Sequence, residues 1–168
     1  MQPSRDFTPE LIPRKGEWIA WVLAGLALIF WGIVRFRVES APWGAIALFV
    51  ILFLSAGSIS LGNWVDRHTV LSLDPEGIQY RNGLRSINLK WKDIQEVRVL
   101  ESNWGQRVQV ISPTISFIFR TLGEVRVQDN LKGRLGFAEG AFILKEILAS
   151  AGLSKRTESE KVRYYTRP

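Results

Sequence analysis

The 168-residue chain contains no cysteine and a single histidine, His68. Without cysteine it can form neither disulfides nor zinc–thiolate sites, and no thiol is present to act as a nucleophile. A lone histidine without a nearby carboxylate cluster makes a poor metal site, and its position offers no base for a Ser–His–Asp arrangement. The motifs G-x-S-x-G and G-x-x-x-x-G-K-[ST] are also absent. These absences predict a protein that is not an enzyme, has no metal or other cofactor, and shows no evident small-molecule substrate.

Charge is missing from two long stretches, residues 18–34 and 43–61. A helix rises about 1.5 Å per residue, so the first run is roughly 26 Å long, and the second is long enough to cross a hydrocarbon core of about 30 Å. A buried core helix of a soluble protein is the alternative, but such a helix usually carries polar residues on one side. We therefore predict a transmembrane helical hairpin over residues 18–64, with spans at 18–34 and 43–62.

Tryptophans mark the expected membrane boundaries, because indole prefers the interface between lipid and water. In an antiparallel hairpin, Trp18, Trp21 and Trp64 mark one boundary, and Trp31 and Trp43 mark the other. The partner of this hairpin is then the lipid bilayer itself.

Basic residues predict the orientation of the hairpin. The connecting loop, 35–42, carries two arginines, whereas four basic residues flank the hairpin on its other side: Arg5, Arg14, Lys15 and Arg67. Basic residues concentrate on the cytoplasmic side. We predict a two-span integral protein with cytoplasmic N- and C-termini, in a bacterial inner or plasma membrane. Residues 1–17 contain three prolines and show no periodicity, so we expect an extended, poorly ordered segment rather than a cleavable signal peptide.

Small residues gather on both apolar runs. Gly25 and Gly32 lie seven residues apart on one helical face, and residues 55–62 are unusually rich in glycine, serine and alanine. Small residues let helices approach closely in lipid. Two interpretations stay open, namely packing within the hairpin and contact with another membrane protein. Neither run holds an ionisable residue, which argues against an ion pathway.

After Trp64 the apolar residues alternate with a period of two, as in strands. Asp74-Pro75-Glu76-Gly77 is typical of a tight turn, and Asn82-Gly83 is the strongest hairpin signal in the chain. The pattern predicts about seven short antiparallel strands in a small barrel or sandwich. Apolar residues then follow a helical spacing, and the stripe is Phe137, Ala141, Leu144, Leu148 and Ala151, with Gly152 placed as a C-cap. We expect disorder in the charged tail, 153–168.

The stretch Leu73–Tyr80 and the W-x-D-I-x-x-V pattern of Trp91, Asp93, Ile94 and Val97 resemble the bacterial PH-like domain family. The resemblance implies an α+β membrane protein, in which a seven-stranded antiparallel barrel over residues 66–152 is capped by a C-terminal α-helix and follows a two-helix anchor. This arrangement is also similar to photosystem assembly factors with two spans and a PH-like domain. In phosphoinositide-binding PH domains the first hairpin loop carries a lysine–arginine cluster, whereas here residues 74–77 are acidic.

Within this motif we expect Trp91 to close the core and Asp93 to accept backbone N–H groups in the connection after it. A ligand site at the two residues is the alternative. Ile94 and Val97 complete the structural motif.

The formal charge of +6 arises mainly after Asn63. The candidates for binding lipid or a partner are Arg67, Arg81, Arg85, Lys90 and Lys92, and a second set is Arg120, Arg126, Lys132 and Arg134. Each could gain about 1 kcal/mol beside anionic lipid, although a solvated strand face is the alternative. Dispersed basic residues argue against nucleic acid.

The sequence therefore predicts a non-enzymatic, membrane-anchored scaffold. It would dock a membrane-protein partner or complex at the cytoplasmic face, in an assembly or accessory role. Recognition of anionic-lipid headgroups is the alternative.

Overall fold

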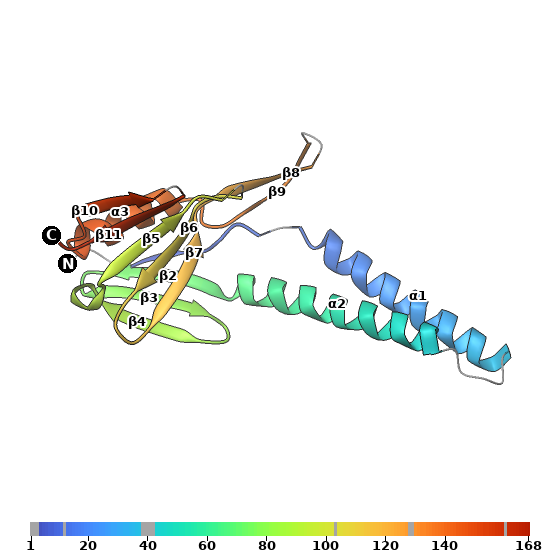
Figure 1. The fold of residues 1–168 in the computed structure, drawn as a ribbon. Coiled ribbons are helices and arrows are strands. Elements are labelled where there is room, and N and C mark those ends of the chain that lie inside the picture. The colour runs from blue at the N-terminus through green and yellow to red at the C-terminus, as the bar shows by residue number, and fades with distance from the viewer. Residues whose placement is uncertain (1–3, 12, 38–42, 103, 128–129, 160) are drawn as a thin grey trace. The chain divides into compact units, whose positions relative to one another are not determined.

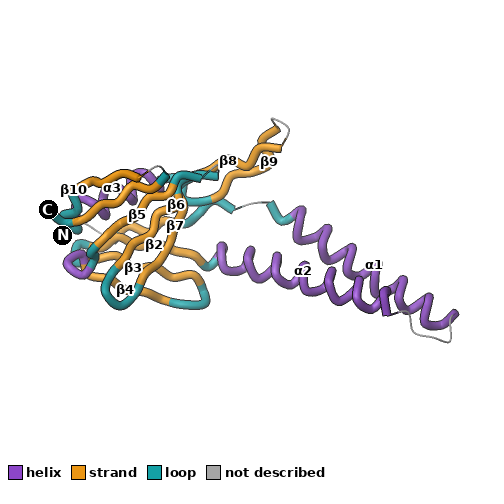
Figure 2. The backbone as a smooth tube through the Cα atoms, in the orientation of Figure 1, coloured by secondary structure: helices purple, strands orange, loops and turns teal. Residues whose placement is uncertain are grey.

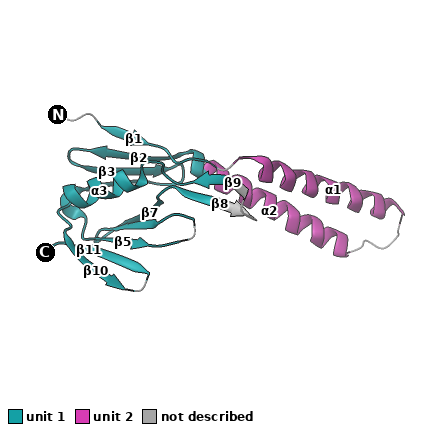
Figure 3. Ribbon diagram, turned by 90° about the horizontal axis from the view of Figure 1, so that it is seen from above, with its two compact units in different colours: residues 1–12, 65–168 teal, residues 13–64 magenta. Residues whose placement is uncertain are grey.

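The computed structural model describes residues 4–11, 13–37, 43–102, 104–127, 130–159 and 161–168. The chain divides into two compact units, one of residues 13–64 and one of residues 1–12 together with 65–168 (Figure 3). Figure 2 shows that the first unit is helical and that the second is built mainly of strands.

The helical unit contains α1 (Lys15–Arg37) and most of α2 (Trp43–Arg67). Both helices are long and apolar enough to cross a membrane, and only 11% of the most apolar window of each is buried. A core helix of a soluble protein would be mostly buried. Where the two helices pack, the buried side chains are Ala24, Ala27 and Ala56, because small residues let the backbones approach.

The other unit contains a four-stranded and a five-stranded antiparallel sheet and a separate two-stranded hairpin (Figure 1). The four-stranded sheet has the order β1 (Arg5–Phe7), β2 (Thr69–Asp74), β3 (Gly77–Asn82) and β4 (Ser86–Lys90). The five-stranded sheet has the order β10 (Lys155–Ser159), β11 (Val162–Thr166), β5 (Glu96–Leu100), β6 (Arg107–Ile111) and β7 (Ser116–Arg120). The hairpin consists of β8 (Gly123–Val127) and β9 (Asn130–Leu135).

One hydrophobic core joins the inner faces of the two larger sheets. Leu71, Tyr80 and Ile87 lie opposite one another in the four-stranded sheet, and Val99 and Val108 are paired in the other. All of them belong to a single buried cluster. The helix α3 (Gly140–Ser150) adds Ile143 and Ile147 to this core.

The predicted closed seven-stranded barrel is wrong. In the described part of the chain, the two larger sheets share no hydrogen-bonded strands, and eleven strands are present. The short 3₁₀ helix η1 (Trp91–Asp93) lies between β4 and β5, so the chain changes sheet there instead of continuing the ladder.

Both ends of the chain differ from the prediction. Within the N-terminal segment expected to be poorly ordered, β1 pairs with β2, and Phe7 is only 5% exposed. In the tail expected to be disordered, β10 pairs with β11 and β11 pairs with β5. All three strands are short and carry charged residues, and every residue of β10 is exposed, so their composition resembles that of a disordered segment.

The structure confirms the predicted turn at Asn82-Gly83 and the predicted helix end at Gly152. At the β3–β4 turn, Gly83 has a positive φ of 77°, and the Asn82 Oδ1 accepts hydrogen bonds from the backbone N–H groups of Leu84 and Arg85. Gly152, with φ of 67°, follows α3 as predicted. Its N–H bonds to Ala149 O and that of Leu153 to Leu148 O, a Schellman arrangement.

The stripe predicted for the last helix is wrong in part. Phe137 precedes α3, Ala141 is exposed, and Ile143 and Ile147 form the buried centre instead. An isoleucine buries more apolar surface than an alanine. The helix therefore turns the face of Ile143 and Ile147 toward the core, and Ala141 stays exposed.

Candidate functional site

A polar network joins the two helices near the start of α1. The Trp21 indole N–H donates to Ser60 Oγ at 2.8 Å, and the Ser60 hydroxyl donates to Glu17 Oε1 at 2.9 Å. The Asn63 amide donates to the second carboxylate oxygen of Glu17 at 2.8 Å. The network holds the beginning of α1 beside the last turns of α2. The sequence analysis missed it because Glu17 precedes the first apolar run and its partners lie 43 and 46 residues away.

The five boundary tryptophans differ in their surroundings. Trp18 and Trp43 are largely exposed, at 70% and 81%, and Trp64 is exposed as well. Trp21 packs edge-on against Phe53 with ring centroids 5.5 Å apart. Trp31 is partly buried, and its indole N–H has no hydrogen-bond partner within the described residues.

The glycines of the two helices lie outside their mutual contact. A Cβ added at Gly25, Gly32 or Gly57 would meet no atom within 4 Å beyond the local helix. The hydroxyls of Ser55 and Ser58 donate to carbonyls one turn earlier in their own helix, at 2.7 and 2.8 Å. The hairpin therefore packs through alanines. Gly25 and Gly32 on α1 define a glycine surface that no side chain of the described residues approaches within 4 Å of a Cβ placed there.

The predicted basic candidates separate into two groups. Arg81 faces Ser86 across the β3–β4 ladder, and Arg85 lies in the turn beyond it. Arg67 ends α2, two residues before Thr69, which pairs with Asn82. Lys90 instead pairs with Gly77, four residues along β3 from Arg81, which corresponds to about 13 Å. Lys92 follows in η1. All five side chains are exposed, and three of them lie at one end of the four-stranded sheet.

Of the second basic set, the structure describes the side chains of Arg120 and Arg134. Arg134 lies 3.8 Å from Glu124 across the β8–β9 hairpin. The side chains of Arg126 and Lys132 lie outside the described part of the chain. Arg120 lies at the end of β7.

The W-x-D-I-x-x-V motif serves the structure of the domain. The half-buried Trp91 packs on the core, and its indole N–H donates to the carbonyls of Asp74 and Pro75 at 3.0 and 3.1 Å. Ile94 and Val97 are fully buried. Asp93 is exposed, and no hydrogen bond from a described residue reaches its side chain, while the N–H of Ile94 bonds to Trp91 O. The motif thus fixes the acidic turn at residues 74–77.

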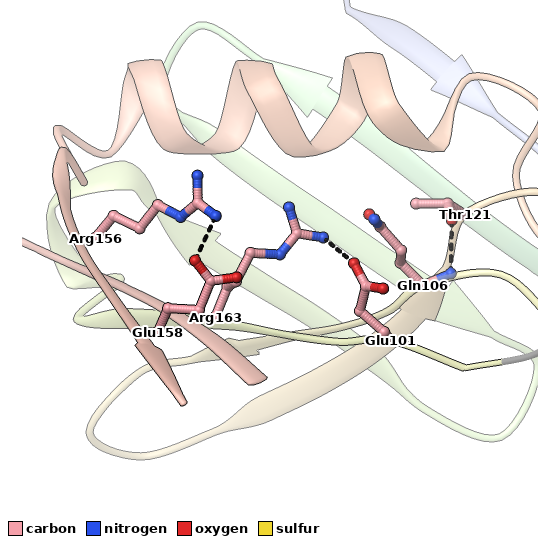
Figure 4. Close-up of polar contacts among 6 residues, drawn as sticks. All are labelled: Glu101, Gln106, Thr121, Arg156, Glu158 and Arg163. Atoms are coloured by element: carbon pink, nitrogen blue, oxygen red, sulfur yellow. Dashed lines mark hydrogen bonds and ion pairs between the residues drawn. The ribbon is translucent and has the colours of Figure 1, made fainter. Parts of the chain in front are cut away.

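The C-terminal hairpin covers the edge of β5. Arg163 reaches Glu101 at 2.9 Å, and Arg156 reaches Glu158 at 2.7 Å. Figure 4 shows both arginines on the side of the sheet that faces α3, with the Gln106–Thr121 contact farther along it. Arg167 donates to the backbone carbonyls of Trp91 and Lys92. These contacts attach the last strand to the core, although neither composition nor periodicity indicated a strand there.

The described residues contain no group of three or more His, Cys, Asp and Glu side chains that could hold a metal ion. Residues 68–133 match the family model of the bacterial PH domain, and the two apolar helices lie N-terminal to the match. No curated protein and no solved structure gives a significant match to the chain.

Proposed function

Because residues 68–133 belong to the bacterial PH domain family and follow two apolar helices, we propose that this protein is a membrane-anchored, non-enzymatic binding module. It docks a membrane-protein partner or complex at the cytoplasmic face, in an assembly or accessory role. The hairpin supplies the anchor, and PH domains are in general interaction modules rather than catalysts.

The observation that carries this proposal is the glycine surface. Gly25 and Gly32 have free space above them, although small residues on membrane helices are typical of close helix–helix contact. The contact within the hairpin uses Ala24, Ala27 and Ala56 instead. A helix from a partner could therefore approach α1 at its glycines without displacing α2.

Site-specific photocrosslinking in native membranes tests this proposal. Leu28 lies on the same face of α1 as the two glycines, because it is three residues after Gly25 and four before Gly32. A diazirine-bearing residue at Leu28 is expected to give one dominant protein adduct. The matched control is Phe30, which is also exposed but lies about 160° away around the helix, and its adducts should be lipids.

Enlarging the glycines provides the second arm of the experiment. G25L with G32L should abolish the protein adduct at Leu28 while leaving the hairpin folded, since a Cβ at either position meets no atom within 4 Å beyond the local helix backbone. Lipid adducts alone at Leu28, or an adduct that is insensitive to the double substitution, would overturn the docking proposal.

A second candidate function is recognition of anionic lipid headgroups, supported by the grouping of Arg67, Arg81 and Arg85 at one end of the sheet. Each arginine near an anionic surface contributes about 1 kcal/mol, and the contribution falls with salt. In nanodiscs of anionic lipid, amide hydrogen exchange in the turn of residues 82–85 should be slower than in zwitterionic discs. Added salt should return the exchange rate to its faster value. R81A with R85A should lose this protection, whereas K90A, at the other end of the sheet, should keep it. Protection that is equal in zwitterionic discs would contradict this function.

A further inference from the structure

The unit of residues 1–12 and 65–168 contains a cavity of about 440 Å³ that none of the predicted functions uses. Its polar lining comes mainly from Glu10, Asp66, Tyr80, Arg107 and Arg120. We propose that this cavity binds a zwitterionic phospholipid headgroup, namely a phosphate joined to a primary ammonium group as in phosphoethanolamine. The assignment of a lipid as the source rests on the membrane anchorage proposed above.

Two arginines in the cavity are arranged as an anion site. Arg107 on β6 and Arg120 on β7 are directly opposite in the ladder, and like charges in that position repel each other. The guanidinium group of neither arginine forms a hydrogen bond or an ion pair with a described residue, although the charge of Arg120 acts on Asp66. Arg98 lies on the same face of the sheet. Its guanidinium group forms an ion pair with Glu96 at 2.8 Å and lies over the Tyr164 ring. A phosphate between the two guanidinium groups would remove the repulsion and accept several charge-assisted hydrogen bonds.

Tyr80 supplies a further donor. Its side chain is 8% exposed, lines the cavity, and stacks on Phe117 with ring centroids 5.0 Å apart. Within the described residues its hydroxyl forms no hydrogen bond and is not fully buried, so it can donate a hydrogen bond to a ligand in the cavity. The hydroxyl of Thr69, in the same lining, is by contrast already bonded to Val65 O at 2.8 Å.

Two carboxylates select a ligand that carries both charges. Asp66 and Glu10 line the same cavity. Burial raises the pKa of Asp66, and the positive charge of Arg120 opposes this rise by favouring the carboxylate. A simple anion would be repelled by these carboxylates, whereas an ammonium group attached to the phosphate would donate hydrogen bonds to them. A primary ammonium fits better than a quaternary one, because a quaternary ammonium has no N–H to donate and is bound through exposed aromatic faces. The phenylalanines in the lining, Phe119 and Phe137, are buried in the core.

The position of Asp66 along α2 matches the depth of a headgroup. The second apolar run ends at Leu61, and Asp66 lies five residues later in the same helix, about 8 Å farther along its axis. The polar layer on each side of a bilayer is roughly 5–8 Å thick. If Leu61 lies at the edge of the hydrocarbon, Asp66 lies among the headgroups, which favours lipid over a soluble metabolite as the source.

Titration of the delipidated full chain in maltoside micelles tests the site, with binding followed by calorimetry. The four probes are glycerophosphoethanolamine, glycerophosphocholine, inorganic phosphate and dihexanoyl phosphatidylethanolamine. We expect the ethanolamine headgroup to bind about tenfold more tightly than the choline headgroup or phosphate, and the short-chain lipid to bind more tightly still. R107Q and R120Q should each weaken binding by about tenfold.

Two further variants separate binding from folding. D66N should improve the affinity for inorganic phosphate and reduce the preference for ethanolamine over choline, a change of selectivity that an unfolded protein cannot show. R98Q, on the same sheet face but outside the cavity lining, should bind like the native chain.

The outcomes distinguish the alternatives. Equal affinity for ethanolamine and choline headgroups would overturn the role of the carboxylates. Phosphate binding that is insensitive to D66N would reduce the site to a general anion site, and no binding of any probe would overturn the proposal.

Headgroup binding needs no bilayer, so alkaline extraction of native membranes tests the anchorage separately. Glycerophosphoethanolamine bound as tightly as the short-chain lipid would point to a soluble source.

Discussion

At the scale of the residue, Trp91 links three parts of the domain. Its indole N–H bonds to two carbonyls of the turn between β2 and β3, and its ring packs on the core. Its own backbone carbonyl accepts a hydrogen bond from Arg167 near the C-terminus. One residue, through its side chain and its backbone carbonyl, therefore fixes the point at which the chain passes from the first sheet to the second.

Replacing Trp91 by phenylalanine removes the N–H but keeps most of the ring. We expect W91F to lower the free energy of unfolding by about 1 kcal/mol, the usual contribution of a hydrogen bond of this kind. Urea unfolding of the full chain in maltoside micelles, followed by circular dichroism, measures the change.

The control for this substitution is Trp104, whose side chain is 54% exposed and forms no hydrogen bond within the described residues. W104F should leave the unfolding midpoint within experimental error, since exposed substitutions typically change stability by less than about 0.5 kcal/mol. Equal midpoints for W91F and the native chain would show that the indole bonds contribute nothing.

At the scale of the element, the C-terminal hairpin protects a sheet edge. Without β11, β5 would expose its unpaired backbone groups beside Val97 and Val99. Such an edge pairs readily with other chains. The new edge, β10, carries Lys155, Arg156 and Glu158, all exposed, and charged edge strands resist further pairing. The hairpin thus replaces an edge prone to association by one that resists it.

A chain ending at Ser154 should reveal this role. Removal of β10 and β11 is expected to accelerate amide exchange in β5 and to produce concentration-dependent self-association, because the β5 backbone loses its partner. Exchange measured by mass spectrometry and light scattering in detergent provide the two readouts. R163A, which removes the ion pair with Glu101 but keeps the strand, should remain monodisperse. Slow β5 exchange in the truncated chain would contradict the pairing.

At the scale of the whole molecule, a small strand-rich domain follows two helices that are long and apolar enough to cross a membrane. The basic residues flanking the helices favour a cytoplasmic location for the domain. The orientation bears on both proposals, because a partner on the cytoplasmic side and the lipids of the inner leaflet require the domain to be on that side.

Cysteine labelling tests the orientation in the full chain, which has no cysteine of its own. F36C, at the exposed end of α1, should react with a membrane-impermeant maleimide in intact bacterial spheroplasts. T157C, in the exposed strand β10, should react only after the membrane is permeabilised. The reverse pattern would place the domain outside the cytoplasm, and labelling of both positions in intact cells would contradict a membrane-spanning hairpin.

The sequence alone determined the features that depend on neighbouring residues. These include the two apolar helices, the turn at Asn82-Gly83, the alternation within the strands after Trp64 and the helix cap at Gly152. Each follows from composition or from the φ preference of one or two residues, which distant parts of the chain do not change.

The tertiary structure decided the features that depend on residues far apart in the chain. The pairing of β1 with β2, the addition of β11 to β5, the contacts of Glu17 with Ser60 and Asn63, and the arginine pair of the cavity all belong to this group. So does the open arrangement of two sheets in place of a closed barrel. A single strand or side chain carries no local signal for its partner, because the free energy of such a contact comes from burial and pairing that arise only when the whole domain has folded.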